Sequence, residues 1–207
     1  GFNVTVPYKE NFFRISDNLQ DRAKNIGSVN LVYKKNKNVY GDNTDYIGFA
    51  KTYKKLVTKN VNKILLIGAG GAARSILQFL NDEKIKQVDI FTRTLNKKKI
   101  LSRTMKFDNF YIDSKEIQNK HYDLIINASD AGMLGRKNLA SNIYKLVPNT
   151  SFVIDIVYNP IRTKLIETAR ANNVPNDGGL GMLLEQAKPS FEAWFNTKVA
   201  INQYLKN

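Results

Sequence analysis

The chain contains 207 residues, of which 43% are hydrophobic, and its formal net charge is +14. This composition predicts a globular protein with one large or two small cores. The chain has no cysteine, which excludes a disulfide framework and a cysteine nucleophile, and its single histidine argues against a metal site. Lys and Arg are spread along the chain without a nucleic-acid motif, and no apolar run could span a bilayer, so we expect no specific nucleic-acid partner and no membrane.

The first 43 residues predict a short strand, two short helices and a hairpin. The strand covers about 2–6, the helices lie between Glu10 and Ile26, and the hairpin covers 28–40. The chain opens at Gly1 without an initiator methionine and enters this strand at once. We therefore expect that upstream sequence is missing and that this α/β region is incomplete.

Helices and strands alternate from residue 44 onward. A helix over about 44–56 precedes strands near 63–67, 87–92, 123–127 and 151–156, with helices between them, and the chain closes with helices near 182–194 and 198–206. This alternation predicts an α/β fold in which a doubly wound parallel sheet is covered by helices.

A glycine turn follows the strand 63–67 and leads directly into a helix. Gly68 allows a tight turn, Gly70 allows close approach of a pyrophosphate to the backbone, and Ala73 is small enough for close helix packing. The helix N-terminus then offers free N–H donors to an anion. Because a second strand at 87–91 follows about twenty residues later, the pattern predicts a dinucleotide site rather than an ordinary strand-to-helix turn.

The residues after that second strand indicate which dinucleotide binds. An NAD site usually has Asp or Glu here to bind the ribose 2′-hydroxyl, whereas this chain has Thr92, Arg93 and Thr94, followed by Lys97. The planar guanidinium of an arginine suits a phosphate, so we expect NADP(H). The neighbouring Lys98 and Lys99 are interpreted as a solvated helix face.

Three other segments carry polar or glycine patterns. Residues 3–9 place polar side chains on one face of a strand that ends at a proline and a lysine. In 41–45, Asp42 and Thr44 are equally well explained as helix N-caps and as functional groups. The stretch 178–181 is a glycine hinge into a helix whose Gln186 faces either a ligand or water.

Together these segments resemble the shikimate dehydrogenase family, in the same order across nearly the whole chain. The similar segments are Asn3 to Lys9, Gly41 to Asp45, Gly68 to Arg74 with Thr92 to Thr94, Asn127 to Met133, Asp155 to Pro160 and Gly179 to Gln186. The resemblance implies a Rossmann-like NADP-binding domain at 45–178 and an α/β substrate domain made of 1–44 and 179–207, with part of the latter absent and the active-site cleft between the two.

The resemblance also implies an NADP-dependent oxidoreductase that reversibly reduces 3-dehydroshikimate to shikimate, in the cytoplasm, on the route to aromatic amino acids. Lys9 would be the general acid that protonates the developing alkoxide, and Asp45 its hydrogen-bonding partner. A lysine carries its proton at neutral pH, which fits this role. Alternatives are a quinate/shikimate dehydrogenase and a catalytically silent NADP-binding fragment. The family includes monomers and dimers, so the resemblance leaves the oligomeric state open.

Further roles follow from the same resemblance. Substrate-binding positions are Thr5, Asn30, Tyr158 and Gln186, whereas Asn3 is interpreted as structural. Cofactor-binding positions are Gly68, Ala69, Gly70, Gly71, Ala72, Thr92, Arg93, Thr94, Lys97, Asn127, Ala128, Ser129, Val157, Gly179 and Met182. Asp130 departs from the family pattern and is expected to place a negative charge near the cofactor groove, which would weaken NADP binding.

Overall fold

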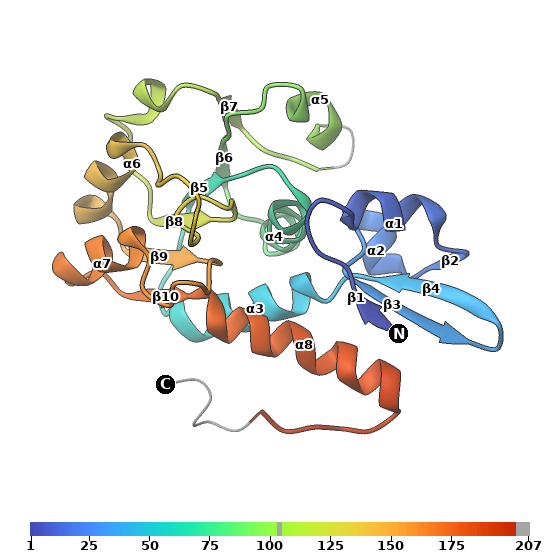
Figure 1. Cartoon of the computed structure of the whole chain (residues 1–207). Coiled ribbons are helices and arrows are strands. Elements are labelled where there is room, and N and C mark those ends of the chain that lie inside the picture. Colours follow the sequence, from blue (N-terminus) through green and yellow to red (C-terminus); the bar gives the residue numbers. More distant parts are fainter. Residues whose placement is uncertain (103–104, 202–207) are drawn as a thin grey trace.

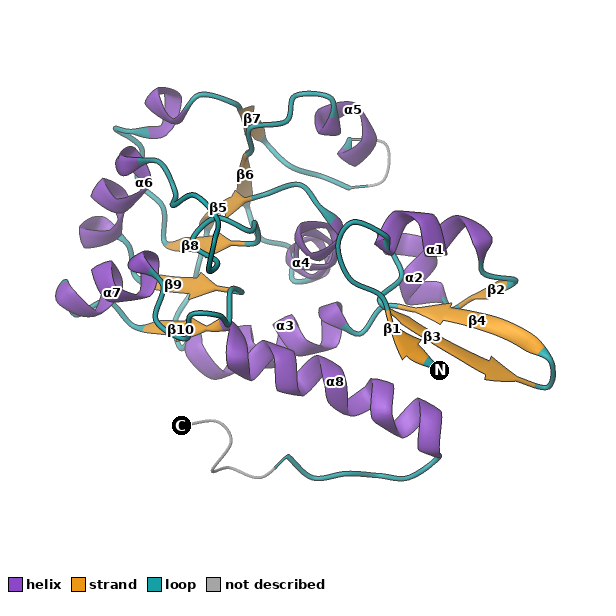
Figure 2. Cartoon of the chain, viewed as in Figure 1, coloured by secondary structure: helices purple, strands orange, loops and turns teal. Residues whose placement is uncertain are grey.

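The chain folds around two sheets that lie at opposite ends of the molecule (Figure 1). The structure is a computed structural model, which describes residues 1–102 and 105–201. Figure 2 shows two long helices, α3 (Asp45–Leu56) and α8 (Gly179–Phe195), running side by side between the sheets. These helices connect the two halves, so the space between the sheets is bounded by elements from both ends of the chain.

The smaller sheet contains four strands in the order β1-β3-β4-β2. Its elements are β1 (Phe2–Asn3), β2 (Asn18–Leu19), β3 (Leu31–Lys35) and β4 (Asn38–Asp42), with the helices α1 (Lys9–Ile15) and α2 (Asp21–Ile26). The strands β3 and β4 form an antiparallel hairpin whose two turn residues, Asn36 and Lys37, both have positive φ, at 49° and 70°. Positive φ at both turn residues matches the twist of the paired strands, and asparagine adopts this conformation more readily than most residues other than glycine.

The larger sheet contains six parallel strands in the order β10-β9-β8-β5-β6-β7. Its strands are β5 (Lys63–Ile67), β6 (Gln87–Phe91), β7 (Asn109–Tyr111), β8 (Leu124–Asn127), β9 (Phe152–Asp155) and β10 (Asn176–Gly178). The order reverses direction between β5 and β8. In open α/β sheets, ligands bind at the carboxyl ends of the strands beside such a reversal.

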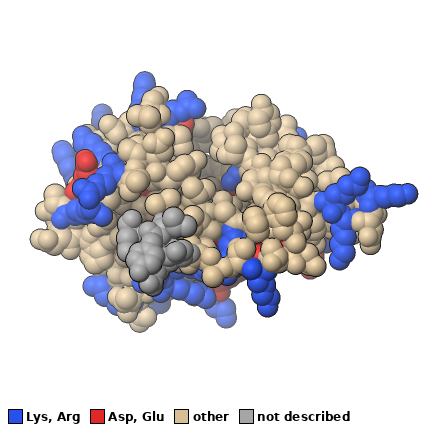
Figure 3. Space-filling view, turned by 60° about the horizontal axis from the view of Figure 1, so that its bottom comes forward, with Lys and Arg blue, Asp and Glu red and all other residues tan. Residues whose placement is uncertain are grey.

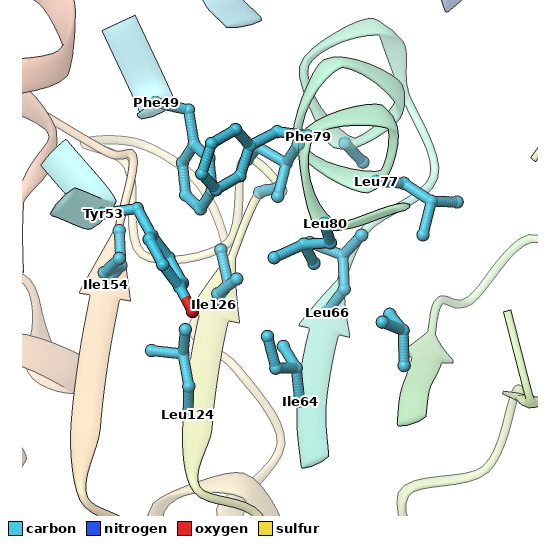
Figure 4. Packing of buried hydrophobic residues seen from close by; sticks show 14 of the residues in the cluster. Phe49, Tyr53, Ile64, Leu66, Leu77, Phe79, Leu80, Leu124, Ile126 and Ile154 are labelled. Carbon is cyan, nitrogen blue, oxygen red and sulfur yellow. The ribbon is translucent and has the colours of Figure 1, made fainter. Parts of the chain in front are cut away.

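Helices cover both faces of the six-stranded sheet, which confirms the doubly wound architecture. Ile64 and Leu66 of β5 point toward α3 and α4 (Gly71–Asp82), where Phe49 and Phe79 pack among them (Figure 4). The alternate residues of β5 pack instead with α6 (Ser141–Leu146) and α7 (Lys164–Ala171). Because both faces are buried, the strands read as continuous apolar runs.

Most predicted elements are confirmed, and the differences concern short or polar segments. The strands β2, β7 and β10 were not predicted, since two or three residues show no periodicity. The first strand ends at Asn3, and α8 begins at Gly179 rather than at 182. The final helix predicted at 198–206 is wrong for 198–201, which are not helical, and its remainder lies outside the described residues.

The remaining helical segments are short and lie in the connections of the larger sheet. They are α5 (Lys97–Leu101) and the 3-10 turns Ser114–Ile117 and Val147–Asn149. Across residues 1–102 and 105–201, no helix has the length and hydropathy that crossing a bilayer requires.

Candidate active site

A cavity of about 700 Å³ opens at the carboxyl ends of the central strands of the large sheet, and residues from both sheets line it. The loops after β5, β6, β8 and β9 form one wall, and β1, the start of α1 and the start of α8 form the other. The cavity therefore lies at the reversal in strand order, where the fold predicts a ligand.

The glycine turn after β5 has the geometry of a pyrophosphate cradle. Gly68 has φ +114°, and a Cβ at this position would lie 2.8 Å from the carbonyl oxygen of Ala128. A Cβ at Gly70, by contrast, would meet no atom within 4 Å, although Gly70 lines the cavity. Gly70 is also the N-cap of α4, so the free N–H groups of this helix begin beside open space. These residues fit a dinucleotide phosphate.

Lys9 lies directly against this cradle. A Cβ at Gly71 would lie 3.0 Å from Lys9 Cδ and 3.2 Å from Lys9 Cβ, so a side chain here would force the lysine to shift. The ammonium group donates a hydrogen bond to Asp45 Oδ2 at 2.5 Å, and both side chains are largely buried at the cavity wall. A cationic acid and the phosphate cradle are thus adjacent.

Asp45 is held on its other oxygen by a buried network. Asn30 Nδ2 lies 2.8 Å from Asp45 Oδ1 and 3.1 Å from Gln186 Oε1, and the Thr44 N–H donates to Asn30 Oδ1 at 2.7 Å. Asn30 is 2% exposed and Gln186 9% exposed. Gln186 therefore belongs to the cavity wall, which decides between the two interpretations of its side chain.

The capping interpretation fails for both candidate side chains at the start of α3. Thr44 is the N-cap by position but makes no capping hydrogen bond, and its hydroxyl lies 3.2 Å from Gln186 Oε1 instead. Asp42 pairs with Arg22 at 2.7 Å. The side chain of the neighbouring Asn43 accepts a hydrogen bond from the Tyr46 N–H at 3.3 Å and so caps the helix N-terminus.

The corner of the cavity beyond β6 is cationic and carries internal counter-ions. Thr92, Arg93, Thr94 and Lys97 all line it. Lys97 Nζ lies 3.0 Å from Glu10 Oε1, and Arg93 Nη2 lies 3.8 Å from Asp130 Oδ1. The side chain of Arg93 is 69% exposed, so this pair is solvated. A phosphate bound here would compete with the carboxylates of Asp130 and Glu10 for Arg93 and Lys97.

Asn127 differs from the other predicted site residues because it does not line the cavity. It is fully buried and donates to the Ala131 carbonyl at 3.0 Å and to Asp155 Oδ1 at 2.9 Å, while its own oxygen accepts from Ser129. Asn127 thus shapes the loop that carries Ala128 and Ser129, which do line the cavity.

Asp155 ends β9 behind the same loop. Burial raises the pKa of Asp155 to about 6, although hydrogen bonds from Thr163 Oγ1, the Val157 N–H and Asn127 Nδ2 favour its ionised form. Its partners are neutral, unlike the lysine beside Asp45. This carboxylate connects the loops after β8 and β9.

The structure brings all the other predicted site residues together at the cavity. The lining includes Thr5, Lys9, Asn30, Asp45, Gly68, Ala69, Gly70, Gly71, Ala72, Thr92, Arg93, Thr94, Lys97, Ala128, Ser129, Val157, Tyr158, Gly179, Met182 and Gln186. Sequence reasoning missed Leu183 and the stretch 138–140, and it interpreted Asn3, which also lines the cavity, as structural. Helical spacing from Met182 and Gln186 could have indicated Leu183, but the 138–140 loop carries no pattern.

The positive charge of the chain does not gather at one place on the face drawn in Figure 3. Lys and Arg side chains form separate groups around its edge, with uncharged surface between them. This distribution offers no continuous cationic track for a nucleic-acid backbone on that face.

Comparison with known proteins agrees with this geometry. A family model described as shikimate dehydrogenase substrate binding domain matches residues 1–32, and one described as shikimate / quinate 5-dehydrogenase matches residues 50–174. The chain belongs to the shikimate dehydrogenase family. A relative named shikimate dehydrogenase (NADP(+)) from Clostridium perfringens is 36% identical over 201 residues, which cover 96% of this chain and 73% of the relative.

Solved members of the family share the fold over nearly the whole chain. Shikimate dehydrogenase 1 from Peptoclostridium difficile has a TM-score of 0.85 and 31% identity, covering 98% of this chain and 74% of that protein. Shikimate 5-dehydrogenase from Thermus thermophilus, solved in complex with NADP(H) and shikimate, has a TM-score of 0.80 and 26% identity, with 96% and 74% covered.

Proposed function

We propose that this chain catalyses the reversible NADP-dependent reduction of 3-dehydroshikimate to shikimate. The observation that carries the proposal is the position of Lys9, whose ammonium group is bound to Asp45 and whose stem lies against the glycine cradle at Gly71. This arrangement supports a proton donor next to a bound dinucleotide. Membership of the shikimate dehydrogenase family supports the substrate.

The glycine cradle and the cationic corner supply the contacts that NADP(H) requires. The cradle would hold the pyrophosphate, and Arg93, Thr94 and Lys97 would hold the 2′-phosphate. Bound NADPH supplies the hydride for the carbonyl carbon. We assign cofactor contact also to the other cavity-lining positions predicted from the sequence, while Asn127 positions the loop that makes such contacts.

Lys9 and Asp45 would provide the proton chemistry. When hydride reaches the carbonyl carbon, negative charge develops on oxygen, and Lys9 Nζ donates its proton there. Asp45 holds the ammonium in place, and Asn30 fixes the orientation of Asp45. In the oxidative direction the uncharged lysine would accept the proton from the substrate hydroxyl.

The substrate would lie between Lys9 and the first sheet. Thr5, Asn30, Tyr158 and Gln186 come from different elements or loops and all line the cavity, and Asn30 and Gln186 lie side by side in its wall. Their hydroxyl and amide groups suit hydroxyls of the substrate.

We also propose a division of the chain into a substrate domain of residues 1–44 and 179–207 and an NADP domain of 45–178. Membership of the two sheets supports this division, and the packing of α3 on α8 joins the parts. A cytoplasmic location is proposed because a chain without cysteine suits a reducing compartment. Its state as monomer or homodimer can be measured by light scattering.

The test is to mix the chain with NADP+ and shikimate and follow NADPH absorbance, with NAD+ and quinate in parallel. We expect NADPH formation, and a fall in kcat of about 10³ for Lys9→Ala, because the loss of a positioned acid typically costs 10²–10⁴. The NADP+ dissociation constant should stay within about twofold, since Lys9 acts in the transition state.

Two outcomes would contradict the proposal. One is that the wild-type chain binds NADP+ and shikimate but forms no NADPH, which would indicate a silent cofactor-binding protein. The other is that Lys9→Ala weakens NADP+ binding as much as turnover, which would make Lys9 a structural residue. A higher kcat/KM with quinate than with shikimate would change the assigned substrate but not the assigned roles of Lys9 and Asp45.

A further inference from the structure

Asp130 places a carboxylate inside the cofactor-facing corner of the cavity. It lines the cavity with Arg93 and is half exposed. Its two oxygens face different cations: Oδ1 lies 3.8 Å from Arg93 Nη2, and Oδ2 lies 3.5 Å from Arg136 Nε. Arg93, the main candidate to bind a 2′-phosphate, is therefore already beside an anion of the chain itself.

This carboxylate and a 2′-phosphate would need the same part of Arg93. Like charges a few ångströms apart repel one another, and a guanidinium that binds two anions stabilises each of them less than it would stabilise one alone. NAD carries no phosphate at that position and would not meet this repulsion. The carboxylate of Asp130 would therefore disfavour NADP and leave NAD unaffected.

We propose that Asp130 is a specificity-determining residue: its carboxylate competes with the 2′-phosphate of NADP for Arg93 and so reduces the preference of this chain for NADP over NAD. The inference rests on the proposed function, because it presumes that the cavity binds a nicotinamide dinucleotide. Arg136 moderates the competition by holding the second oxygen of Asp130.

A similar pair exists at Lys97, but it is less suited to a test. Lys97 lies 3.0 Å from Glu10, and the same Glu10 oxygen lies 3.2 Å from Arg74 Nη2. Arg74 is buried, so removal of Glu10 would leave a buried cation without this partner and disturb the fold around it. Asp130 can be changed with little effect on folding because both its cations are more than 60% exposed.

The experiment measures dissociation constants of NADP+ and NAD+ for the wild-type chain, Asp130→Asn and Asp130→Ser. We expect NADP+ affinity to rise about two- to fivefold in both variants, the range for solvated charge pairs, and NAD+ affinity to stay unchanged. The gain should shrink toward unity near 1 M salt, where screening acts over about 3 Å. A merely structural role would not produce this salt dependence.

Two further variants sharpen the test. Asp21→Asn makes the same change in net charge on α2, at a side chain that is 94% exposed and outside the cavity lining, and should leave both affinities unchanged. Arg136→Gln should move the preference in the opposite direction, because Asp130 would then be free to bind Arg93 alone.

The outcomes separate the two claims. A wild-type chain that binds neither dinucleotide overturns the proposed function, and this inference with it. A chain that binds NADP+ but shows the same NADP+ to NAD+ ratio in both Asp130 variants as in Asp21→Asn overturns the inference alone. An equal gain for NAD+ would also overturn it, because the effect would not depend on the 2′-phosphate.

Discussion

The corner of the cavity that we propose to be catalytic and the corner that we propose to bind the 2′-phosphate are built in opposite ways. Around Lys9 and Asp45 the partners are buried and the hydrogen bonds to Asp45 measure 2.5 and 2.8 Å. In the part of the chain that the structure describes, the one ion pair that Arg93 makes is with Asp130 at 3.8 Å, and both of these side chains are at least half exposed. A group that must keep one orientation is locked by burial, whereas a group that must accept a ligand's charge is left solvated and exchangeable.

After Lys9→Ala, removing the charge of Asp45 should produce the largest effect, because Asp45 holds the ammonium group of Lys9. We expect Asp45→Asn to lower kcat about 10²-fold, since the amide cannot hold the ammonium as a carboxylate does. The NADP+ dissociation constant should change less than about twofold. Steady-state kinetics and cofactor titration check both values, and a parallel loss of cofactor affinity would contradict the assigned role.

Asp155 is a buried carboxylate whose hydrogen-bond partners are all neutral, so its effect on stability can be measured as a function of pH. Its folded-state pKa of about 6 lies above the value of 3.8 for the free side chain, so the folded state binds more protons between these values. Stability contributed by this group is therefore fully present below about pH 4 and is lost as pH rises through about 6, by about 3 kcal/mol in total. Denaturant unfolding from pH 4.5 to 7.5 of the wild-type chain and of Asp155→Asn measures this.

The difference between the two unfolding free energies should fall over that range and become flat above about pH 6.5. The other carboxylates cancel in the difference because both proteins carry them. A difference that rises with pH would mean that the hydrogen bonds to Asp155 outweigh its burial.

Two glycines of the cradle offer a matched pair. Gly70→Ala should leave the unfolding free energy within about 0.5 kcal/mol, because its Cβ meets nothing, but should weaken NADP+ and NAD+ equally by about tenfold, since the methyl group enters the pyrophosphate position. Gly68→Ala should instead destabilise the fold by about 1–3 kcal/mol, owing to its positive φ and the Ala128 oxygen. Equal destabilisation by both changes would exclude this distinction.

Lys97 should show the smallest effect because Glu10 already engages it. We expect Lys97→Gln to weaken NADP+ about threefold and NAD+ not at all. The neighbouring Lys98→Gln provides the control with the same loss of charge. An effect larger than that of Arg93→Gln, measured in the same titration, would make Lys97 the main phosphate contact.

Sequence reasoning predicted the cofactor half of the site more completely than the surrounding fold. The cradle at Gly68 and Gly70 follows from a local backbone requirement, and the cations after β6 are recognised by their position after the second strand, so both patterns are visible within a few residues. The edge strands β7 and β10 were missed because they are three residues long and only partly buried. The pairing of Lys9 with Asp45 required the family resemblance, since no spacing along the chain indicates it.

The amino-acid sequence by itself determined the parallel sheet, the glycine turn into α4 and the arginine after the second strand, because each follows from periodicity or from a local backbone requirement. Only the tertiary structure decided which distant groups meet. Lys9 reaches Asp45 across 36 positions, Asn30 reaches Gln186 across 156, and Lys97 reaches Glu10 across 87. These contacts join α1 to α3, the residue before β3 to α8, and α5 to α1, and packing between distant elements leaves no periodic signal in the chain.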